Sequence, residues 1–331
     1  MNNEKKIQAF ENTTIGFLNI GNTCYMNSFL QIILHSPNFL NELKIFSKKH
    51  KLGNNLIENI IKLSEYPNKT EYLFFIKDYM KNVSDDYGSY TQNDSQEFGK
   101  DLINEIINEI KRILNISYEY SDSERDVYSK YTKKSKYKNF IDKYQNNEIN
   151  IEKMFTINEI EEFWDKTNKD YIFNTSFDIE LIFPKSQTKK IYKLNELLDY
   201  KYDNKDLNLG KKSNKTKICK LPDILIITII RSLIGQKYIN YPLLIPKELC
   251  LENYIDKELL NNNKEKSKYD LYAINKKYGN SYEIGHYFCC IKINKKWYNF
   301  EDNKIYKSSF DQTKPSTNAI GLFYIKKNKI S

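Results

Sequence analysis

The chain has 331 residues, of which 40% are hydrophobic, 29% are charged and 14% are aromatic. At roughly 100–200 residues per domain, this length corresponds to one large domain or two ordinary ones, and the composition suits a chain that folds around a core. Lysine and arginine number 52 against 43 acidic residues, a net charge of +9, but only three of the 52 are arginine, the residue that dominates base recognition. We therefore expect no nucleic-acid partner.

Membrane insertion, secretion and metal binding find no support in the sequence. The longest apolar run, 224–230, is far shorter than the ~20 residues of a membrane-spanning helix. The first residues lack the apolar region of a secretion signal. The 5 cysteines are odd in number and include no CxxC pair, which argues against a disulfide framework and a cysteine-rich zinc site. We expect an intracellular protein, cytoplasmic and/or nuclear, that uses no metal and no cofactor.

The predicted elements begin with helices. A short apolar piece at 15–20 is predicted to be a strand, and after a Gly-Asn-Thr turn the apolar residues of 24–36 recur at helical spacing until Pro37. Residues 94–116 form the clearest amphipathic helix, with a single apolar stripe. Residues from about 117 to 147 are polar and repetitive, which predicts a loop or an insertion.

Strands follow in the rest of the chain. Six segments have the alternating or continuously apolar pattern of strands: 177–184, 221–230, 269–274, 287–293, 296–300 and 320–327. The segments 200–217 and 256–268 are rich in lysine and asparagine and are predicted to be loops. Since helices come first and an antiparallel sheet afterwards, the predicted fold class is α+β.

Cys24 is the cysteine best placed for chemistry. It stands at the start of a predicted helix, where free N–H groups and a partial positive charge stabilise a thiolate and lower its pKa. It is therefore a candidate nucleophile, although a lone cysteine is more often a buried structural residue. The other four cysteines lie in strands or loops, and for them the structural interpretation is preferred: Cys219, Cys250, Cys289 and Cys290.

A thiol nucleophile needs a base, and the chain offers 3 histidines. His35 lies eleven residues after Cys24 on the same predicted helix, which at ~1.5 Å per residue puts it roughly 16 Å away. His50 lies in a basic segment that is predicted to be at the surface. His286 follows a glycine and opens a strand, so it is the best candidate base.

The hairpin after His286 brings a carboxylate to it. If the residues that flank a three-residue turn at 294–296 pair with each other, Asp302 shares the face of His286 and Glu301 points to the other face. A slip of one residue would exchange the two acids. The simpler interpretation is that the two acids only mark the charged end of a strand.

Several segments together resemble the ubiquitin-specific proteases, a family of papain-like deubiquitinases. The stretch 16–37, GFLNIGNTCYMNSFLQIILHSP, closely resembles the cysteine box of that family. Residues 91–106 resemble its Gln-x-Asp-x-x-Glu-Phe segment, and 269–305 resemble its histidine box. Residues from 221 to 254 resemble the strand pair before the histidine box, and 319–327 the closing strand. The matches run in family order over nearly the whole chain.

The resemblance implies a papain-like cysteine protease fold over residues 15–327. A helical thumb would occupy about 15–116, a polar insertion about 117–149, and the fingers and an antiparallel β palm about 150–327. The C-terminal Gly-Gly of ubiquitin would enter between thumb and palm. Because the chain lacks the two CxxC pairs of the family's zinc-binding fingers, the resemblance implies a reduced fingers region without metal.

The resemblance also implies roles in catalysis. Cys24 would attack the carbonyl after the last glycine of ubiquitin, His286 would move the proton, and Asn19 would donate to the oxyanion. Alignment with the family assigns the orientation of His286 to Glu301, whereas the simple hairpin register favours Asp302. We give a slight preference to Asp302, because the extra methylene of a glutamate must be accommodated.

Three further residues are expected to bind substrate. Asp94 and Glu97 match family positions near the channel for the basic tail of ubiquitin, and Tyr287 follows the candidate base. Asp94 is also a suitable helix cap, with Glu97 completing a start that resembles a capping box. Both interpretations can hold together.

The expected function is that of a thiol-dependent deubiquitinase, a monomer whose partners are ubiquitin and ubiquitinated proteins. One alternative is the same chemistry on a ubiquitin-like modifier. A second is an inactive ubiquitin-binding scaffold, against which the presence of Cys24, His286 and Asn19 argues. A third is a basic nucleic-acid-binding protein, which leaves the cysteine box unexplained.

Overall fold

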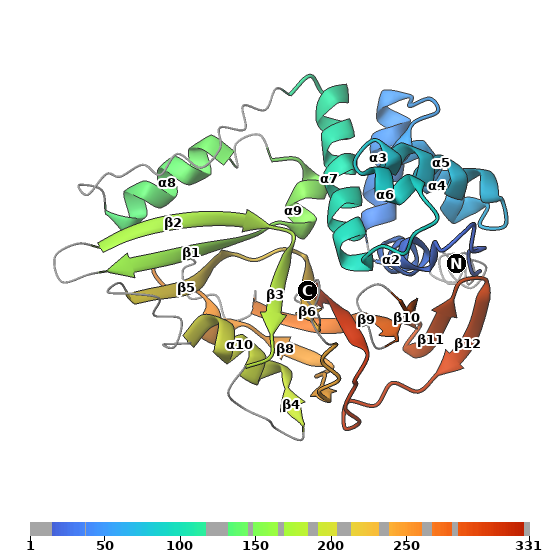
Figure 1. Cartoon of the computed structure of the whole chain (residues 1–331). Helices are drawn as coiled ribbons and strands as arrows, with labels where there is room; N and C mark the ends of the chain where they lie inside the picture. Colours follow the sequence, from blue (N-terminus) through green and yellow to red (C-terminus); the bar gives the residue numbers. More distant parts are fainter. Residues whose placement is uncertain are drawn as a thin grey trace, which may run out of the picture.

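The computed structural model describes residues 15–36, 38–116, 132–144, 148–164, 169–184, 191–203, 213–231, 238–259, 267–279 and 284–327. In this part of the chain, helices fill the N-terminal third and the strands follow them (Figure 1). The predicted α+β class is therefore confirmed. No helix of the described residues is long and apolar enough to cross a membrane.

Six helices among the described residues make up the N-terminal third, which forms one of the two halves of the molecule and which we call the helical half. They are α2 (Cys24–Leu34), α3 (Phe39–His50), α4 (Leu56–Glu65), α5 (Thr70–Lys81), α6 (Asp85–Gly88) and α7 (Ser95–Ile113). Every residue of α2 except the last, Leu34, is buried, as expected of a helix that is enclosed by other elements. The helices predicted at 24–36 and 94–116 are confirmed.

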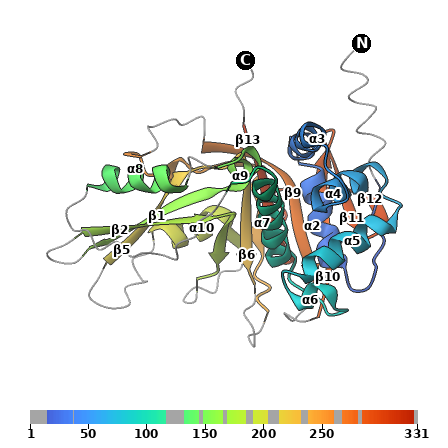
Figure 2. The same cartoon turned by 90° about the horizontal axis from the view of Figure 1, so that it is seen from above.

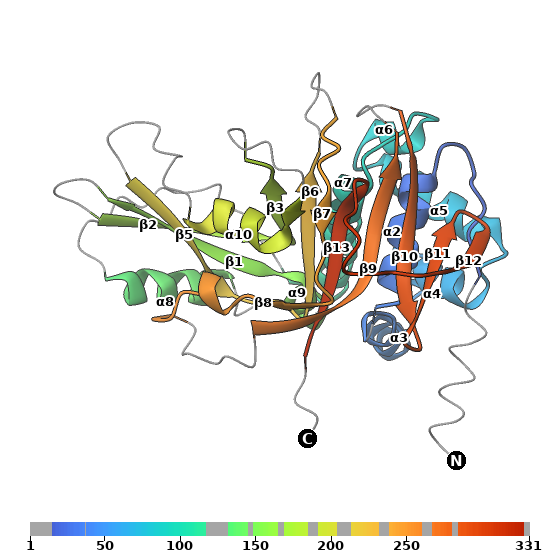
Figure 3. The same cartoon turned by 90° about the horizontal axis from the view of Figure 1, so that it is seen from below.

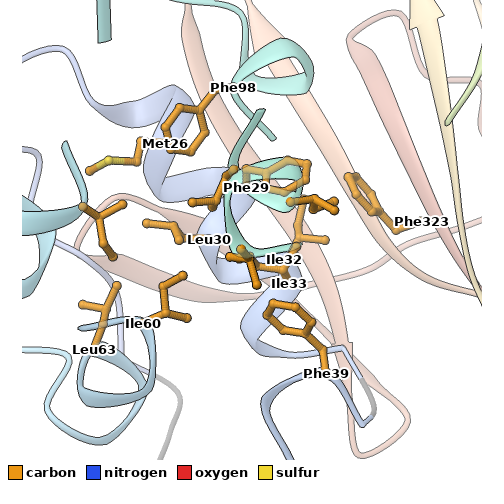
Figure 4. Packing of buried hydrophobic residues seen from close by; sticks show 14 of the residues in the cluster. Met26, Phe29, Leu30, Ile32, Ile33, Phe39, Ile60, Leu63, Phe98 and Phe323 are labelled. Carbon is orange, nitrogen blue, oxygen red and sulfur yellow. The ribbon is translucent and has the colours of Figure 1, made fainter. Parts of the chain in front are cut away.

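Glycine lets α7 pass close to α2. A Cβ on Gly99 would lie 2.0 Å from Cε2 of Phe29, so a larger residue would have to displace that ring. The ring of Phe29 in turn packs edge-on against the ring of Phe323 in strand β13 (Ala319–Lys326), with 5.7 Å between ring centroids (Figure 4). Burying one such side chain contributes about 1.5–3 kcal/mol. The contact therefore anchors the helix that carries Cys24.

An eight-stranded sheet, the large sheet, lies beneath the helical half, in the order β12-β11-β10-β9-β13-β6-β3 with β8 beside β9. Its strands are β3 (Asp178–Ile182), β6 (Ile224–Ile230), β8 (Glu248–Cys250), β9 (Lys268–Tyr278), β10 (His286–Ile293), β11 (Lys296–Glu301), β12 (Lys304–Ser308) and β13 (Ala319–Lys326). The six predicted strands are all present. The sheet is antiparallel as predicted except at one edge, where β3 and β6 pair in parallel. The long crossover between these two strands makes that pairing possible.

Both faces of the large sheet are covered. Figure 3 shows β13, β9, β10 and β11 side by side, with α2 behind them. Cys289 belongs to the core between the sheet and the helices, and its neighbour Cys290 belongs to the core on the opposite face. This is the alternation expected of adjacent strand residues, and it means that side chains of β10 at odd positions face α2.

A three-stranded antiparallel sheet, the small sheet, extends away from the helical half in the order β2-β1-β5 (Figure 2). Its strands are β1 (Ile157–Trp164), β2 (Lys169–Ser176) and β5 (Ser213–Lys220). The strands β1 and β2 were not predicted. The loop predicted at 200–217 is wrong at 200–203, which are helical, and from residue 213 onward, where β5 forms, while residues 204–212 lie outside the described residues. The acidic residues of β1 interrupt the apolar alternation that identifies a strand. They are tolerated in the sheet because they form ion pairs with lysines, as Glu162 does with Lys169 at 3.0 Å.

The remaining elements connect the two sheets. They are α8 (Lys133–Tyr144), α9 (Asn150–Phe155), α10 (Leu194–Asp203), the short parallel pair β4 (Tyr192–Lys193) and β7 (Leu243–Leu244), and a 3-10 turn, η1 (Glu252–Tyr254). The loop predicted at 117–147 is wrong where α8 forms, and residues 117–131 and 145–147 lie outside the described residues. Lys133 of α8 bonds Glu162 of the small sheet at 2.6 Å, which helps to hold this polar helix in place.

Candidate active site

A turn at residues 19–23 places Cys24 at the first position of α2. The side-chain oxygen of Asn19 accepts hydrogen bonds from the backbone N–H groups of Gly21 and Thr23, each at 3.1 Å. Gly21 has a φ of +111°, and a Cβ there would lie 2.5 Å from the ring of Tyr90. Glycine is therefore required in this turn.

The strand predicted at 15–20 is wrong. The segment is irregular and runs against the turn between β11 and β12, where the N–H of Phe17 donates to the carbonyl oxygen of Asp302 at 2.9 Å. A Cβ on Gly16 would lie 2.3 Å from the same oxygen. This close approach ties the turn that contains Asn19 to the turn that contains one of the two candidate acids.

The thiol of Cys24 lies between α2 and β10. The residue is only 2% exposed, and its Sγ accepts a hydrogen bond from the backbone N–H of Tyr287 at 3.5 Å. Burial raises the pKa of this thiol, the Tyr287 N–H lowers it, and the negative charge of Asp302 raises it, with a net upward direction. The lowered pKa predicted from the helix start is therefore wrong for the free protein, because burial outweighs the N–H groups. Cys24 consequently needs a base to become a nucleophile.

The hairpin that carries His286 has a different register from the predicted one. Ile293 pairs with Lys296, so the turn contains two residues and not three. Those residues, Asn294 and Lys295, have φ values of 48° and 66°. Two successive positive φ angles are the geometry of a two-residue type I′ hairpin turn. The predicted register is therefore wrong by one residue.

The shifted register brings Glu301 to the candidate base. Nε2 of His286 lies 3.3 Å from Oε1 of Glu301, and both side chains are about one-third exposed. Oε2 of Glu301 accepts a hydrogen bond from the hydroxyl of Tyr306 at 2.7 Å. The expectation that Asp302 would lie beside His286 is wrong, and Glu301, the alternative from family alignment, occupies that place.

Asp302 instead binds two asparagines at the start of the chain. It begins the turn after β11 with a φ of +51°. Its Oδ2 accepts from Nδ2 of Asn19 at 3.0 Å, and its Oδ1 accepts from Nδ2 of Asn27 at 2.8 Å. Asn19 is thus held at both ends of its amide, by the 19–23 turn and by Asp302.

The expected substrate-binding residues lie near the thiol or at the start of α7. Oδ1 of Asp94 accepts from the backbone N–H groups of Gln96 and Glu97 at 2.8 and 3.0 Å, so its interpretation as a helix cap is confirmed. Its Oδ2 lies 3.5 Å from the hydroxyl of Tyr287. Glu97 is exposed in the first turn of α7.

Sequence analysis missed a contact between Gln92 and the loop before His286. The side-chain amide of Gln92 donates to the carbonyl oxygen of Gly285 and accepts from its N–H, the latter at 2.8 Å. A Cβ on Gly285 would lie 2.3 Å from the carbonyl oxygen of Tyr278. Gln92 therefore joins the helical half to the residue next to the candidate base, and the first position of the Gln-x-Asp segment was the signal for it.

The other histidines serve elsewhere. Nδ1 of His35 lies 2.8 Å from the carbonyl oxygen of Gln31 in its own helix, and His50 ends α3. Within the part of the chain that the structure describes, no group of three or more histidine, cysteine, aspartate or glutamate side chains could hold a metal ion.

A buried thiol at a helix start thus contacts the strand that begins with His286, and a carboxylate lies 3.3 Å from Nε2 of that histidine. Papain-like cysteine hydrolases combine the same three kinds of side chain, namely a thiol, an imidazole and a group that orients the imidazole. The family model described as ubiquitin carboxyl-terminal hydrolase matches residues 15–324. The chain therefore belongs to the ubiquitin carboxyl-terminal hydrolase family, and the family predicted from the sequence is confirmed.

Two curated relatives match most of the chain. Ubiquitin carboxyl-terminal hydrolase 2 of Bos taurus is 24% identical over 353 residues, covering 93% of this chain and 54% of the relative. Ubiquitin carboxyl-terminal hydrolase 4 of Arabidopsis thaliana is 26% identical over 320 residues, covering 88% of this chain and 84% of the relative. The chain thus spans about half the length of the bovine relative.

Solved structures of the SAGA DUB module that contains Ubp8 share the fold. One of them has a TM-score of 0.71 at 18% identity and covers 97% of this chain and 69% of the other. The same module bound to ubiquitin aldehyde has a TM-score of 0.71 at 19% identity, with 97% and 71% coverage. The predicted papain-like fold is confirmed by this likeness together with the family match.

Proposed function

We propose that this chain is a thiol-dependent deubiquitinase that hydrolyses the isopeptide bond after the C-terminal glycine of ubiquitin. The observation that carries the proposal is the meeting of α2 with the β10–β11 hairpin. There the N–H of Tyr287 donates to Sγ of Cys24, while the preceding residue, His286, lies 3.3 Å from Glu301. Membership of the family supports the choice of substrate.

In this reaction His286 takes the proton of the Cys24 thiol, and the thiolate attacks the carbonyl carbon of the terminal glycine. The resulting imidazolium faces Glu301, whose negative charge stabilises it. His286 then returns the proton to the departing lysine amine, which leaves a thioester on Cys24. Water, deprotonated by His286, hydrolyses the thioester and releases a carboxylate at the ubiquitin C terminus.

We assign the support of the oxyanion to Asn19. Its Nδ2 has two hydrogens, and the bond to Asp302 at 3.0 Å uses one of them. The other remains for the oxygen that becomes negative when Cys24 attacks. Because the 19–23 turn and Asp302 fix this amide before substrate arrives, little reorganisation is needed in the transition state.

The substrate tail is proposed to pass between the two halves of the molecule. The helical half then acts as the thumb, the large sheet as the palm and the small sheet as the fingers. Asp94 and Glu97 supply negative charge at the start of α7 for the basic tail of ubiquitin, and Tyr287 lines the same passage. The Ubp8 module is known bound to ubiquitin aldehyde and to monoubiquitin, which supports ubiquitin as the ligand.

We further propose that the chain acts as a monomer inside the cell. All 5 cysteines lie within the described residues and are free thiols, as is usual in a reducing compartment. Light scattering of the purified protein tests the monomer, with a mass of two or more chains as the contradicting result. The choice between cytoplasm and nucleus is tested by imaging the tagged protein.

Hydrolysis of a ubiquitin C-terminal fluorophore tests the activity. Wild type should release the fluorophore, and Cys24→Ala should release none. Cys250→Ala removes an exposed thiol away from the site and should match wild type. Equal release by Cys24→Ala would refute the proposal, and release from a ubiquitin-like modifier but not from ubiquitin would assign the same chemistry to another substrate.

A further inference from the structure

Lys277 is a buried cation next to the nucleophile. It belongs to β9, is 4% exposed, and pairs directly with Tyr287 of β10. Residues directly opposite in an antiparallel pair project to the same face, and Tyr287 belongs to the core between the sheet and the helices. The Lys277 side chain therefore points toward α2 and Cys24.

The surroundings of Lys277 hold its side chain in this position. Its Nζ lies 5.1 Å from the centroid of the Tyr287 ring. Its aliphatic stem packs on Gly285, where a Cβ would lie 2.6 Å from Cε of Lys277. The same tyrosine uses its backbone N–H to bond Sγ of Cys24. Tyr287 thus contacts both groups, the lysine through its ring and the thiol through its backbone N–H.

Charged groups on the neighbouring elements influence the pKa of Lys277 and of the Cys24 thiol. Burial lowers the pKa of Lys277, whereas the charges of Asp94 at the start of α7 and of Cys24 on α2 raise it. His286, the residue before Tyr287 on β10, lies beside Glu301, and the charge of Asp302 in the β11–β12 turn disfavours the thiolate of Cys24. A positive charge on Lys277 offsets the effect of these acids on the thiol.

We propose that Lys277 stabilises the thiolate of Cys24 that forms when the base takes its proton. The lysine makes no covalent bond and transfers no proton. It sets the acidity of the thiol through its charge, in addition to the imidazolium. The proposal concerns the proposed active site, but it is tested without ubiquitin, so the two can fail separately.

The test is the pH dependence of alkylation of Cys24 by iodoacetamide, followed by peptide mass spectrometry. The exposed thiol of Cys250 serves as the internal reference in every sample. Lys277→Met keeps the length of the stem without charge, and Lys277→Gln is a second neutral variant in case the first does not fold. Lys277→Arg restores the charge. Lys276→Met is the matched control, since its side chain lies over Phe288 on the other face of β9.

The midpoint of the alkylation profile should move up by about 0.5–1 pH unit in the two neutral variants. Wild type, Lys277→Arg and Lys276→Met should share one midpoint, and labelling of Cys250 should not change. An unchanged midpoint in folded Lys277→Met or Lys277→Gln would overturn the proposal and leave Lys277 with a packing role. If the midpoint shifts but no ubiquitin substrate is cleaved, the charge effect stands and the proposed function fails.

Discussion

At the scale of single residues, the two adjacent acids after Phe300 serve different groups. Glu301 is the last residue of β11 and contacts His286, while Asp302 begins the turn and binds Asn19 and Asn27. Neighbouring strand residues point to opposite faces, so one hairpin can place one acid at the base and the other at the oxyanion amide.

Substitution of each acid separates these two roles. Glu301→Ala should lower kcat about tenfold or more with little change in KM, because His286 loses the carboxylate that stabilises its charged form. Asp302→Ala should lower kcat less. It should also destabilise the fold by about 1–3 kcal/mol, because Asn27, a buried residue, loses a hydrogen-bond acceptor. Kinetics on a ubiquitin fluorophore and urea unfolding measure these effects.

Glu301→Gln is the matched control, since it keeps the shape of the side chain and removes the charge. Its kcat should lie between those of wild type and Glu301→Ala. A larger loss of kcat for Asp302→Ala than for Glu301→Ala would contradict this division of roles and make support of Asn19 the dominant contribution.

At the scale of elements, the place of α2 depends on close packing against α7. Gly99→Ala should destabilise the protein by about 1–3 kcal/mol, because its Cβ would collide with the ring of Phe29. Gly53→Ala is the control, since nothing lies within 4 Å of a Cβ there. Urea unfolding of both variants measures the difference. Equal stability of Gly99→Ala and Gly53→Ala would show that α7 can move away without cost.

The small sheet should respond to alkaline pH through Cys219 of β5. This buried thiol donates to the carbonyl oxygen of Asn158 at 3.4 Å, and burial, followed by the charges of Asp256 and Glu159, raises its pKa well above the ordinary value. The folded state keeps the proton while the unfolded chain releases it above about pH 8.5. The stability that protonated Cys219 contributes is therefore complete below that pH and declines as pH rises.

Unfolding free energies of wild type and Cys219→Ala at pH 7.5, 9 and 10 test this prediction. The advantage of wild type should shrink by up to about 1.4 kcal/mol per pH unit above the pKa of the unfolded thiol. Cys250→Ala should follow wild type at every pH. A difference between wild type and Cys219→Ala that stays constant with pH would contradict the raised pKa.

At the scale of the whole molecule, ion pairs join the strands of the small sheet and attach α8 to it. Glu162 of β1 bonds Lys133 of α8 at 2.6 Å and Lys169 of β2 at 3.0 Å. The sequence has no CxxC pair, and no group of three or more histidine, cysteine, aspartate or glutamate side chains in the described residues could hold a metal ion. We therefore expect EDTA to change neither kcat nor the melting temperature. Stoichiometric zinc in the purified protein, or loss of activity on chelation, would refute this.

The sequence predicted more of the helical half and the large sheet than of the small sheet. The apolar spacing of 24–36 and 94–116 identifies α2 and α7 because each helix buries an apolar face. The strands β1 and β2 escaped prediction because their pattern mixes acids with apolar residues, and some of the acids pair with lysines distant in sequence, as Glu162 pairs with Lys133. A strand in such polar surroundings has no regular alternation of apolar and polar residues in its sequence.

The sequence by itself determined the family, and it predicted Cys24 as the nucleophile and His286 as the base, because these depend on local motifs and on helix and strand starts. Family alignment and the simple hairpin register disagreed on which acid lies beside His286, and the tertiary structure decided for Glu301, since the two positive φ angles at Asn294 and Lys295 shorten the turn by one residue and reverse the faces. It also placed Lys277 on the face of the sheet that packs against α2. Strand β9 and helix α2 are some 250 residues apart in sequence, and only the packed fold brings them together.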